Sequence, residues 1–282
     1  MRSIFSMIFC LLFLSSEAQF LNPTTDWFEA ASFFNVKTLT NKNISDVHVM
    51  IRNKNDGEVI IDRGTFLHYE FGTNGNLKRF LKSIKLAQST DTAIVEFYYN
   101  YENQIVKRSE KQGAFHYTFI YKYLNQLPTL AIKIDENSSS KDTLYKRTLK
   151  GEKQSNKLII ETLNEKGVPY KVKEIRYQKD TLITERTTYL RNQNYSEKRF
   201  DYEEGKLKSY TSSSFFHKKQ SSVWEYEYEN EVLISAMLYE DGVKAKKRAF
   251  TFRDDGLIDA VIERNYLEKS IRIYNFLYRF RE

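Results

Sequence analysis

The chain has 282 residues, 41% hydrophobic and 29% charged, which is enough apolar material for a packed core and excludes wholesale disorder. Its 10 glycines and 3 prolines exclude collagen-like and low-complexity architectures, and its single cysteine excludes an intrachain disulfide or a cysteine-based zinc site. The net charge is +7, but charged residues are interspersed along the chain, which favours solubility over a dedicated polyanion site. The length allows one large domain or two small ones.

The first residues have the pattern of a secretory signal peptide. Arg2 provides a positive charge, and the run from Ile4 to Leu14 is almost wholly apolar. Small residues follow at Ser16 and Ala18, the positions that a signal peptidase recognises. A run of about 11 apolar residues is too short to span ~30 Å of hydrocarbon as a helix. We therefore expect residues 1–18 to be cleaved after Ala18, or one or two residues later, leaving no transmembrane segment.

Cys10 lies inside this apolar run and follows Phe9, whereas a bacterial lipoprotein signal has a small residue before its cysteine. The cysteine therefore leaves with the peptide, and the mature chain contains none. A large exported protein without disulfides fits a bacterial envelope, either the periplasm or the cell exterior. Export also argues against nucleic acid as a partner.

Residues 19–40 are predicted to form one short helical segment. Asp26 and Glu29 have the spacing of a capping box. An apolar face extends from Trp27 to Phe34, and Asn35 is a plausible end of the helix. We expect this helix to cap an edge or end of a sheet.

The rest of the chain has the period-two alternation of β-strands, rich in β-branched and aromatic residues. We expect strands over residues 47–51, 59–61, 65–71, 93–101, 115–123 and 130–134. Turn signals stand near Gly57, Asn74-Gly75, Gly205, Asp241-Gly242 and Asp255-Gly256. The polar segment 135–143 is either a linker between a first β lobe, 41–134, and a second, 144–282, or one exposed hairpin tip.

A repeat of about 25 residues runs through the second half. Each unit has two rings or large apolar residues at positions i and i+2, then a polar turn, then an aliphatic residue. The copies begin with Ile175-x-Tyr177, Phe200-x-Tyr202, Tyr226-x-Tyr228 and Phe250-x-Phe252. Two rings at i and i+2 share one face of a strand, and the aliphatic residue returns beside them on the next strand. Stacked hairpins would bury each other's rings.

These units resemble the YD (Rhs-type) repeat, whose pattern is Tyr-x-Tyr-Asp-x-x-Gly-x-Leu. The resemblance is carried by Phe71–Leu77 and Phe250–Ile258 and loosely covers residues 65–282. The Asp after the second ring is replaced in several copies, for example by Gly72 and Glu203. The resemblance implies an all-β fold: an antiparallel meander of repeated hairpins in an open or curved sheet, with one short N-terminal helix. It says almost nothing about activity.

A search for chemistry is mostly negative. The four histidines have no metal-binding spacing in the sequence, and no nucleophile elbow, phosphate-binding loop or dinucleotide fingerprint is present. The carboxylate pairs Glu203-Glu204 and Asp254-Asp255 stand in predicted turns, where acidic residues are ordinary. We expect no catalytic, cofactor or metal site, and no enzyme.

Two functions fit these observations. The first is an exported, non-catalytic repeat protein that binds an envelope protein or glycan through one sheet face. In this interpretation the repeat rings form a buried layer, and the opposite face binds through Tyr195, Tyr210, Trp224 and Tyr239. The alternative is a periplasmic carrier or chaperone for lipids or outer-membrane clients, held in a curved sheet. A flat sheet favours the first function, and an apolar groove favours the second.

Overall fold

The computed structural model describes residues 36–282, except 86–89, 138–140, 180 and 217–218. Within them it has one helix, α1 (Val36–Asn41), and eighteen β-strands. The strands are β1 (Ile44–Asn55), β2 (Ile61–Phe71), β3 (Leu77–Lys85), β4 (Thr90–Tyr99), β5 (Ile105–Gln112), β6 (Phe115–Leu124), β7 (Leu127–Asp135), β8 (Thr143–Gln154), β9 (Lys157–Leu163), β10 (Pro169–Gln178), β11 (Thr181–Tyr189), β12 (Tyr195–Glu203), β13 (Lys206–Phe215), β14 (Lys219–Glu229), β15 (Val232–Glu240), β16 (Val243–Phe252), β17 (Ile258–Asn265) and β18 (Ser270–Phe280). The predicted signal peptide and the predicted helical face from Trp27 to Phe34 lie outside the described residues.

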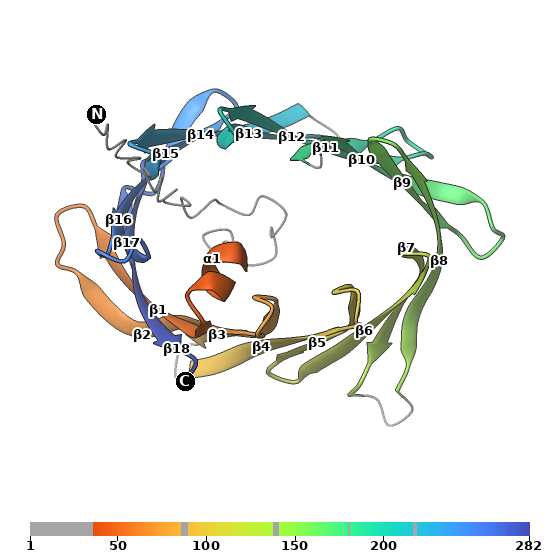
Figure 1. Ribbon diagram of the computed structural model, residues 1–282, viewed down its shortest axis with the longest axis horizontal. Coiled ribbons are helices and arrows are strands. Elements are labelled where there is room, and N and C mark those ends of the chain that lie inside the picture. The colour runs from red at the N-terminus through yellow and green to blue at the C-terminus, as the bar shows by residue number, and fades with distance from the viewer. Residues whose placement is uncertain (1–35, 86–89, 138–140, 180, 217–218) are drawn as a thin grey trace, which may run out of the picture.

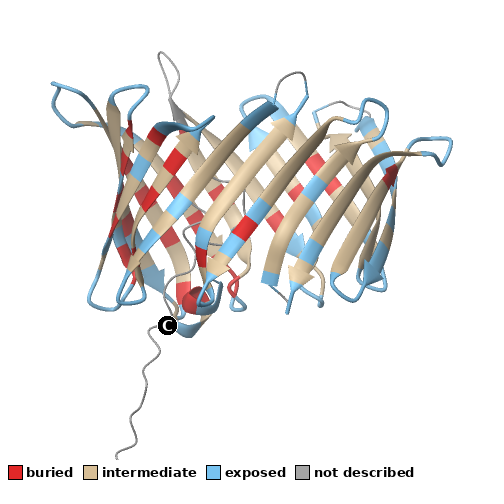
Figure 2. Cartoon of the chain, turned by 90° about the horizontal axis from the view of Figure 1, so that it is seen from above, coloured by how far each residue is buried: buried red, intermediate tan, exposed pale blue. Residues whose placement is uncertain are grey.

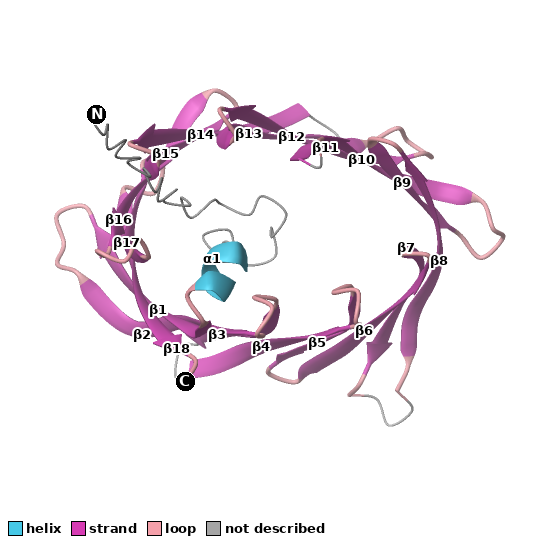
Figure 3. Cartoon of the chain, in the orientation of Figure 1, coloured by secondary structure: helices cyan, strands magenta, loops and turns pink. Residues whose placement is uncertain are grey.

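The strands form one antiparallel barrel (Figures 1 and 3). Each strand pairs with its neighbours in sequence, and β1 closes the ring by pairing with both β2 and β18. The all-β, hairpin-by-hairpin expectation is confirmed, and one short helix precedes the strands, although α1 begins at Val36, after the predicted end at Asn35. The expected open or curved sheet is wrong, because strands at opposite ends of the chain pair along most of their length, from Asn55 with Ser270 to Ile44 with Phe280. Closure removes the two exposed edges that an open meander would leave.

A β-bulge recurs at the second ring of the hairpin units. In β12 and β13, Tyr202 pairs with Leu207 whereas Asp201 pairs with Ser209, so Lys208 is an extra residue. The same irregularity occurs at Phe71, Tyr99, Tyr123, Tyr177, Tyr228 and Phe252. An extra residue on one strand bends it and increases its twist. Repetition of the same bend along successive hairpins supplies curvature that a closed barrel needs.

The predicted turns are confirmed, since each named position falls between two strands. Gly205 and Gly256 have φ of 80° and 78°, the left-handed region that favours glycine in tight turns. The segment 135–143 connects β7 to β8, which pair directly from Leu130–Thr148 to Ile134–Thr143. Strands on both sides of this connection therefore belong to the same sheet.

The packed core lies on the inner wall of the barrel. Helix α1 lies within the ring in Figure 1, and its Leu39 clusters with buried Val47 and Val49 of β1. Paired residues in an antiparallel sheet share a face, so the register extends this inner face around the ring. The other buried members of the cluster are Ile44, Ile51, Leu67, Tyr69, Phe71, Phe80, Leu233, Ala236, Phe250, Leu257, Ile258, Val261, Tyr274 and Phe276. Buried positions alternate with accessible ones along these strands (Figure 2).

Candidate functional site: the inner wall of the barrel

The repeat rings line the inner wall as one aromatic layer. Phe200 and Phe250 are 1% and 8% exposed. Half-buried Tyr226, Tyr228 and Phe252 pack against the core cluster. The register joins the copies, since Phe200 pairs with Tyr210, Tyr210 with Trp224, and Phe250 with Val261 of the cluster. The structure therefore places the rings on one inner face, where Phe200 and Phe250 are buried and Tyr202, Tyr226, Tyr228 and Phe252 are half-buried.

The four residues of the predicted binding face are divided between the two surfaces of the barrel. Tyr210 and Trp224 lie on the inner wall, and the Tyr210 ring stacks on Phe200 at 5.1 Å. Tyr195 pairs with Phe215 on the outer face, and Tyr239 pairs with Val223 there. The four therefore do not form one face. The bulge at Asp201/Tyr202 places Tyr210 on the same face as Phe200, and Trp224 shares the face of Tyr226, two residues later on the same strand.

Away from the aliphatic cluster, the inner wall places cations over aromatic rings. These contacts join Arg108 to Phe119 at 4.0 Å, Lys133 to Tyr117 at 3.8 Å, Arg147 to Tyr145 at 4.3 Å and Lys171 to Tyr189 at 5.7 Å. The register aligns them across strands, because Phe119 pairs with Lys133, which in turn pairs with Tyr145. A cation over a ring is attracted by the ring's electron-rich face. The sequence analysis did not predict these contacts. Their only signal in the sequence was Arg147, two residues after Tyr145 on the same strand, which places both on one face.

The inner wall of β5–β11, which carries these contacts, is predominantly positive. Arg108 forms an ion pair with Glu110 at 2.8 Å and Lys173 forms one with Glu185 at 3.0 Å, whereas Lys133, Arg147 and Lys171 lie over aromatic rings. Burial lowers the pKa of Lys171, and nearby Arg147 lowers it further. A lysine ammonium whose pKa is lowered by burial gains from a bound anion, which restores the favourable interactions lost with water.

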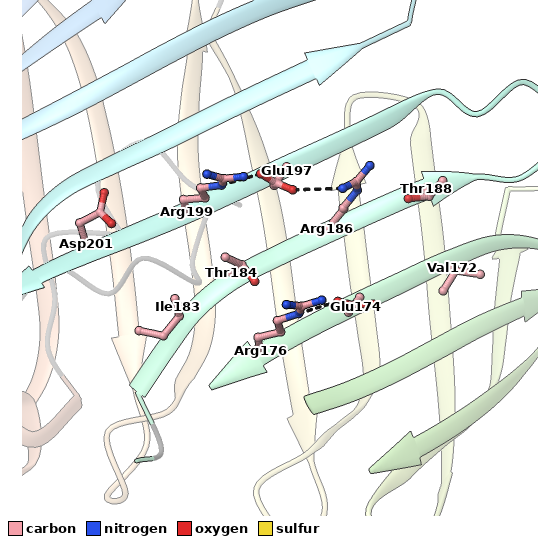
Figure 4. Close-up of a pocket in the computed structure, with 10 residues that line it drawn as sticks. All are labelled: Val172, Glu174, Arg176, Ile183, Thr184, Arg186, Thr188, Glu197, Arg199 and Asp201. Carbon is pink, nitrogen blue, oxygen red and sulfur yellow. Dashed lines mark hydrogen bonds and ion pairs between the residues drawn. The ribbon is translucent and has the colours of Figure 1, made fainter. Parts of the chain in front are cut away.

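The outer face contains a shallow polar groove of about 640 Å³ on β10, β11 and β12 (Figure 4). It is lined by Val172, Glu174, Arg176, Ile183, Thr184, Arg186, Thr188, Glu197, Arg199 and Asp201. Glu197 accepts from Arg199 at 2.6 Å and lies 3.6 Å from Arg186. Glu174 accepts from Arg176 at 2.7 Å. These charges compensate one another, as expected of strand faces in contact with water.

The acidic turn residues and the histidines have structural surroundings in the barrel. Glu204 has a φ of 50° in its turn, and Asp255 accepts a hydrogen bond from the Leu257 amide at 3.1 Å, so both serve turn geometry. His116 lies 3.1 Å from the Ser109 hydroxyl. His48 and His68 pair directly across β1 and β2 on the outer face.

No protein-family model matches the chain, and no curated protein matches it. Among solved structures, the chain is similar to a porin-like protein from Bacteroides uniformis ATCC 8492, with 10% identity over 84% of this chain and 97% of that one and a TM-score of 0.43. A porin-like protein from Bacteroides vulgatus ATCC 8482 has 8% identity, coverage of 84% and 98%, and a TM-score of 0.32. A LolA superfamily protein from Nitrosomonas europaea has 9% identity, coverage of 88% and 92%, and a TM-score of 0.27.

The closed barrel corrects the resemblance to the YD (Rhs-type) repeat. The hairpin units are present, but their sheet closes on itself. Among the residues that the structure describes, no helix is long and apolar enough to cross a membrane.

Proposed function

We propose that this chain is a non-catalytic carrier of the bacterial envelope that holds an elongated amphiphile, acyl chains with an anionic headgroup, against the inner wall of its barrel. The observation that carries the proposal is the distribution of polarity between the two faces. In β12–β18 and β1–β3 the buried aliphatic and aromatic side chains point inward, whereas the outer face of β10–β12 carries ion pairs.

The acyl chains would lie along the aliphatic and aromatic sector formed by β12–β18 and β1–β3. Trp224, Tyr226 and Phe252 contact the core there, yet each keeps part of its side chain accessible. An apolar ligand that covers such surface gains about 25 cal/mol for each Å² removed from water. Rings of this kind also adapt to flexible chains without specific hydrogen bonds.

The headgroup would lie at the cationic sector formed by β6–β11. Lys133 and Lys171 are only half-buried, so water and ligands can reach them. Their neighbour Arg147 is exposed on the same inner face. Hydrogen bonds between such cations and a carboxylate or phosphate are about twice as strong as neutral ones.

The charged outer surface of β10–β12 argues against a barrel that spans a lipid bilayer with these strands. Arg186, in the middle of β11, pairs with Glu197 of β12, and both line the polar groove of the outer face. An arginine facing lipid at the membrane midplane costs roughly 2–4 kcal/mol. An aqueous compartment such as the periplasm suits this surface, in keeping with the signal-peptide pattern of residues 1–18.

The test is a titration of the purified chain with dodecanoate, dodecanol and dodecylamine, followed by tryptophan fluorescence, because Trp224 lies on the inner wall. We expect saturable binding of dodecanoate, weaker binding of dodecanol and least of dodecylamine. Lys133→Gln and Lys171→Gln should weaken dodecanoate several-fold and leave dodecanol unchanged. Arg186→Gln, on the outer face, is the matched control. Absence of saturable binding, or equal loss in the control, would contradict the proposal.

A further inference from the structure

Four potential metal ligands form a two-by-two patch on the outer face of β1 and β2. Asp46 pairs across the strands with Glu70, and His48 pairs with His68. Within each strand the two residues are two apart and therefore share a face. The patch could not be recognised from the sequence, because 19 residues lie between His48 and His68 along the chain.

The side chains of this patch converge. His68 Nε2 lies 3.4 Å from Asp46 Oδ1 and 3.6 Å from Glu70 Oε1. Ligand atoms of all three residues lie within 4.8 Å of one another. Bonds of about 2.0 Å to a tetrahedral zinc ion place ligand atoms roughly 3.3 Å apart. The observed separations exceed those of good hydrogen bonds but approach the edge of such a tetrahedron.

The geometry points to a binding site for a divalent transition metal of the zinc class, with Asp46, His68 and Glu70 as ligands and His48 as the fourth. Imidazole with carboxylate suits zinc, whereas magnesium and calcium prefer oxygen ligands alone. The His48 ring lies 5.8 Å from the His68 ring, centroid to centroid, and stacks on Phe66 at 5.3 Å, so it must turn away from Phe66 to become the fourth ligand. The three converging side chains are 21–35% exposed, which leaves a path for the ion to enter.

Neighbouring groups fit this assignment. Ser45 donates to Asp46 Oδ2 at 2.5 Å, leaving Oδ1 directed at His68. Such an outer hydrogen bond orients a ligating carboxylate. Arg79 lies 3.5 Å from Glu70 Oε1 and competes for that oxygen, so a bound metal must displace it toward Glu96, 3.7 Å away.

The location gives the site a structural role. Strand β1 joins the two ends of the barrel, with β2 on one side and β18 on the other. A metal that bridges β1 and β2 would fasten the hairpin whose first strand also pairs with β18, and would stabilise the fold, since an ion bound only by the folded state raises its stability. The site lies on the outer face and does not depend on the proposed carrier function.

Calorimetric titration with Zn²⁺, repeated with Mg²⁺, tests the site on the full chain. We expect one equivalent of Zn²⁺ to bind and raise the melting temperature, with no effect of Mg²⁺. His68→Ala should weaken Zn²⁺ binding at least tenfold. His116→Ala, another histidine on the outer face, is the matched control and should bind as the original chain does. No saturable Zn²⁺ binding, or an equal loss in His116→Ala, would overturn the proposal.

Co²⁺ absorption provides a readout that is independent of stability. Co²⁺ in a tetrahedral site absorbs strongly in the visible range, and we expect this band in the original chain and its loss in the conservative Asp46→Asn and His68→Gln variants. Both replacements keep the side chain near its original size, so folding can be verified separately by circular dichroism. A band that persists in both folded variants would show an adventitious site elsewhere and refute the assignment.

Discussion

The hydroxyl of Tyr278, near the end of β18, donates a hydrogen bond of 2.8 Å to the carbonyl oxygen of Ile258, the first residue of β17. The same relationship occurs three more times around the barrel. The other pairs are Tyr99 to Leu77 at 2.8 Å, Tyr123 to Ile105 at 3.0 Å and Tyr228 to Leu207 at 3.0 Å. A tyrosine at the end of one strand thus donates to a carbonyl at the beginning of the preceding strand, close to a bulge.

Removal of one such hydroxyl should destabilise the barrel modestly. Tyr228→Phe leaves the ring in place but takes the hydrogen bond from the Leu207 carbonyl. We expect the free energy of unfolding to fall by about 0.5–1.5 kcal/mol. Urea denaturation followed by circular dichroism measures the change. Tyr195→Phe, on the outer face, should change it less, and an equal loss in both variants would contradict the role of the bond.

Two half-buried tyrosines should make the protein sensitive to alkali. Burial raises the pKa of Tyr99 and Tyr228 to about 12, above the ordinary value of 10.0. Between these values the unfolded chain loses the phenolic protons while the folded chain retains them, so stability falls as pH rises. Melting temperatures should therefore decline from about pH 10 to pH 12. The decline should be shallower in a Tyr99→Phe/Tyr228→Phe variant, and identical slopes would refute this cause.

Strands and turns could be predicted because their signals are local. The alternation in 47–51 and the glycine turns at Gly57 and Gly205 each depend on a few neighbouring residues. Closure could not be predicted, because the same hairpin units build an open or a closed sheet. What distinguishes them is the accumulated bend of many bulges and the pairing of β1 with β18, more than 200 residues apart.

The faces of the candidate binding residues and the histidine patch were also not predicted, because both depend on how neighbouring strands pair. Tyr210 was expected opposite Phe200, but the bulge beside Tyr202 places both rings on the inner wall. Counting by twos along the sequence fails wherever one strand gains a residue. The pairing of His48 with His68 depends on the register of β1 with β2, which no single strand encodes.

The inner aromatic layer should carry more stability than the outer rings. Phe200 is 1% exposed and stacks on Tyr210, so Phe200→Ala should cost about 3–5 kcal/mol. Phe252 is only half-buried against the core, and Phe252→Ala should cost less than that. Phe215→Ala is the control, because its ring is 43% exposed on the outer face. Chemical denaturation would contradict the assignment of faces if Phe215→Ala were as harmful as Phe200→Ala.

Arg281 fastens the end of the chain across the closing junction. Its Nη2 donates to the carbonyl oxygens of Phe71 at 2.9 Å and Gly72 at 2.5 Å, at the end of β2. Arg281→Ala should leave both carbonyls without this donor and reduce stability by about 1–3 kcal/mol. Arg279→Ala removes a nearby exposed cation and should leave the melting temperature unchanged. Hydrogen exchange should locate the loss in β1, β2 and β18, and a uniform loss around the barrel would contradict the assignment.

Helix α1 is held against the inner wall partly by the shape of the turn between β2 and β3. A Cβ added at Gly75 would lie 2.8 Å from the Val36 carbonyl oxygen and 2.7 Å from Thr40 Oγ1. The first of these atoms belongs to the helix backbone and cannot rotate away, so Gly75→Ala should push α1 off the turn.

The variant Gly167→Ala is the control that distinguishes the steric effect of the new methyl group from backbone strain. The φ of Gly167, 75°, matches the 76° of Gly75, and both turns have the same pair of backbone hydrogen bonds, but nothing lies within 4 Å of a Cβ added at Gly167. Both alanine variants therefore pay the cost of the left-handed conformation, about 1 kcal/mol. Only Gly75→Ala should expose residues 36–41 to proteolysis and hydrogen exchange, because only there does the new methyl group meet the helix. Equal protection of α1 in the two variants would show that the helix is held by Leu39 and the core cluster alone.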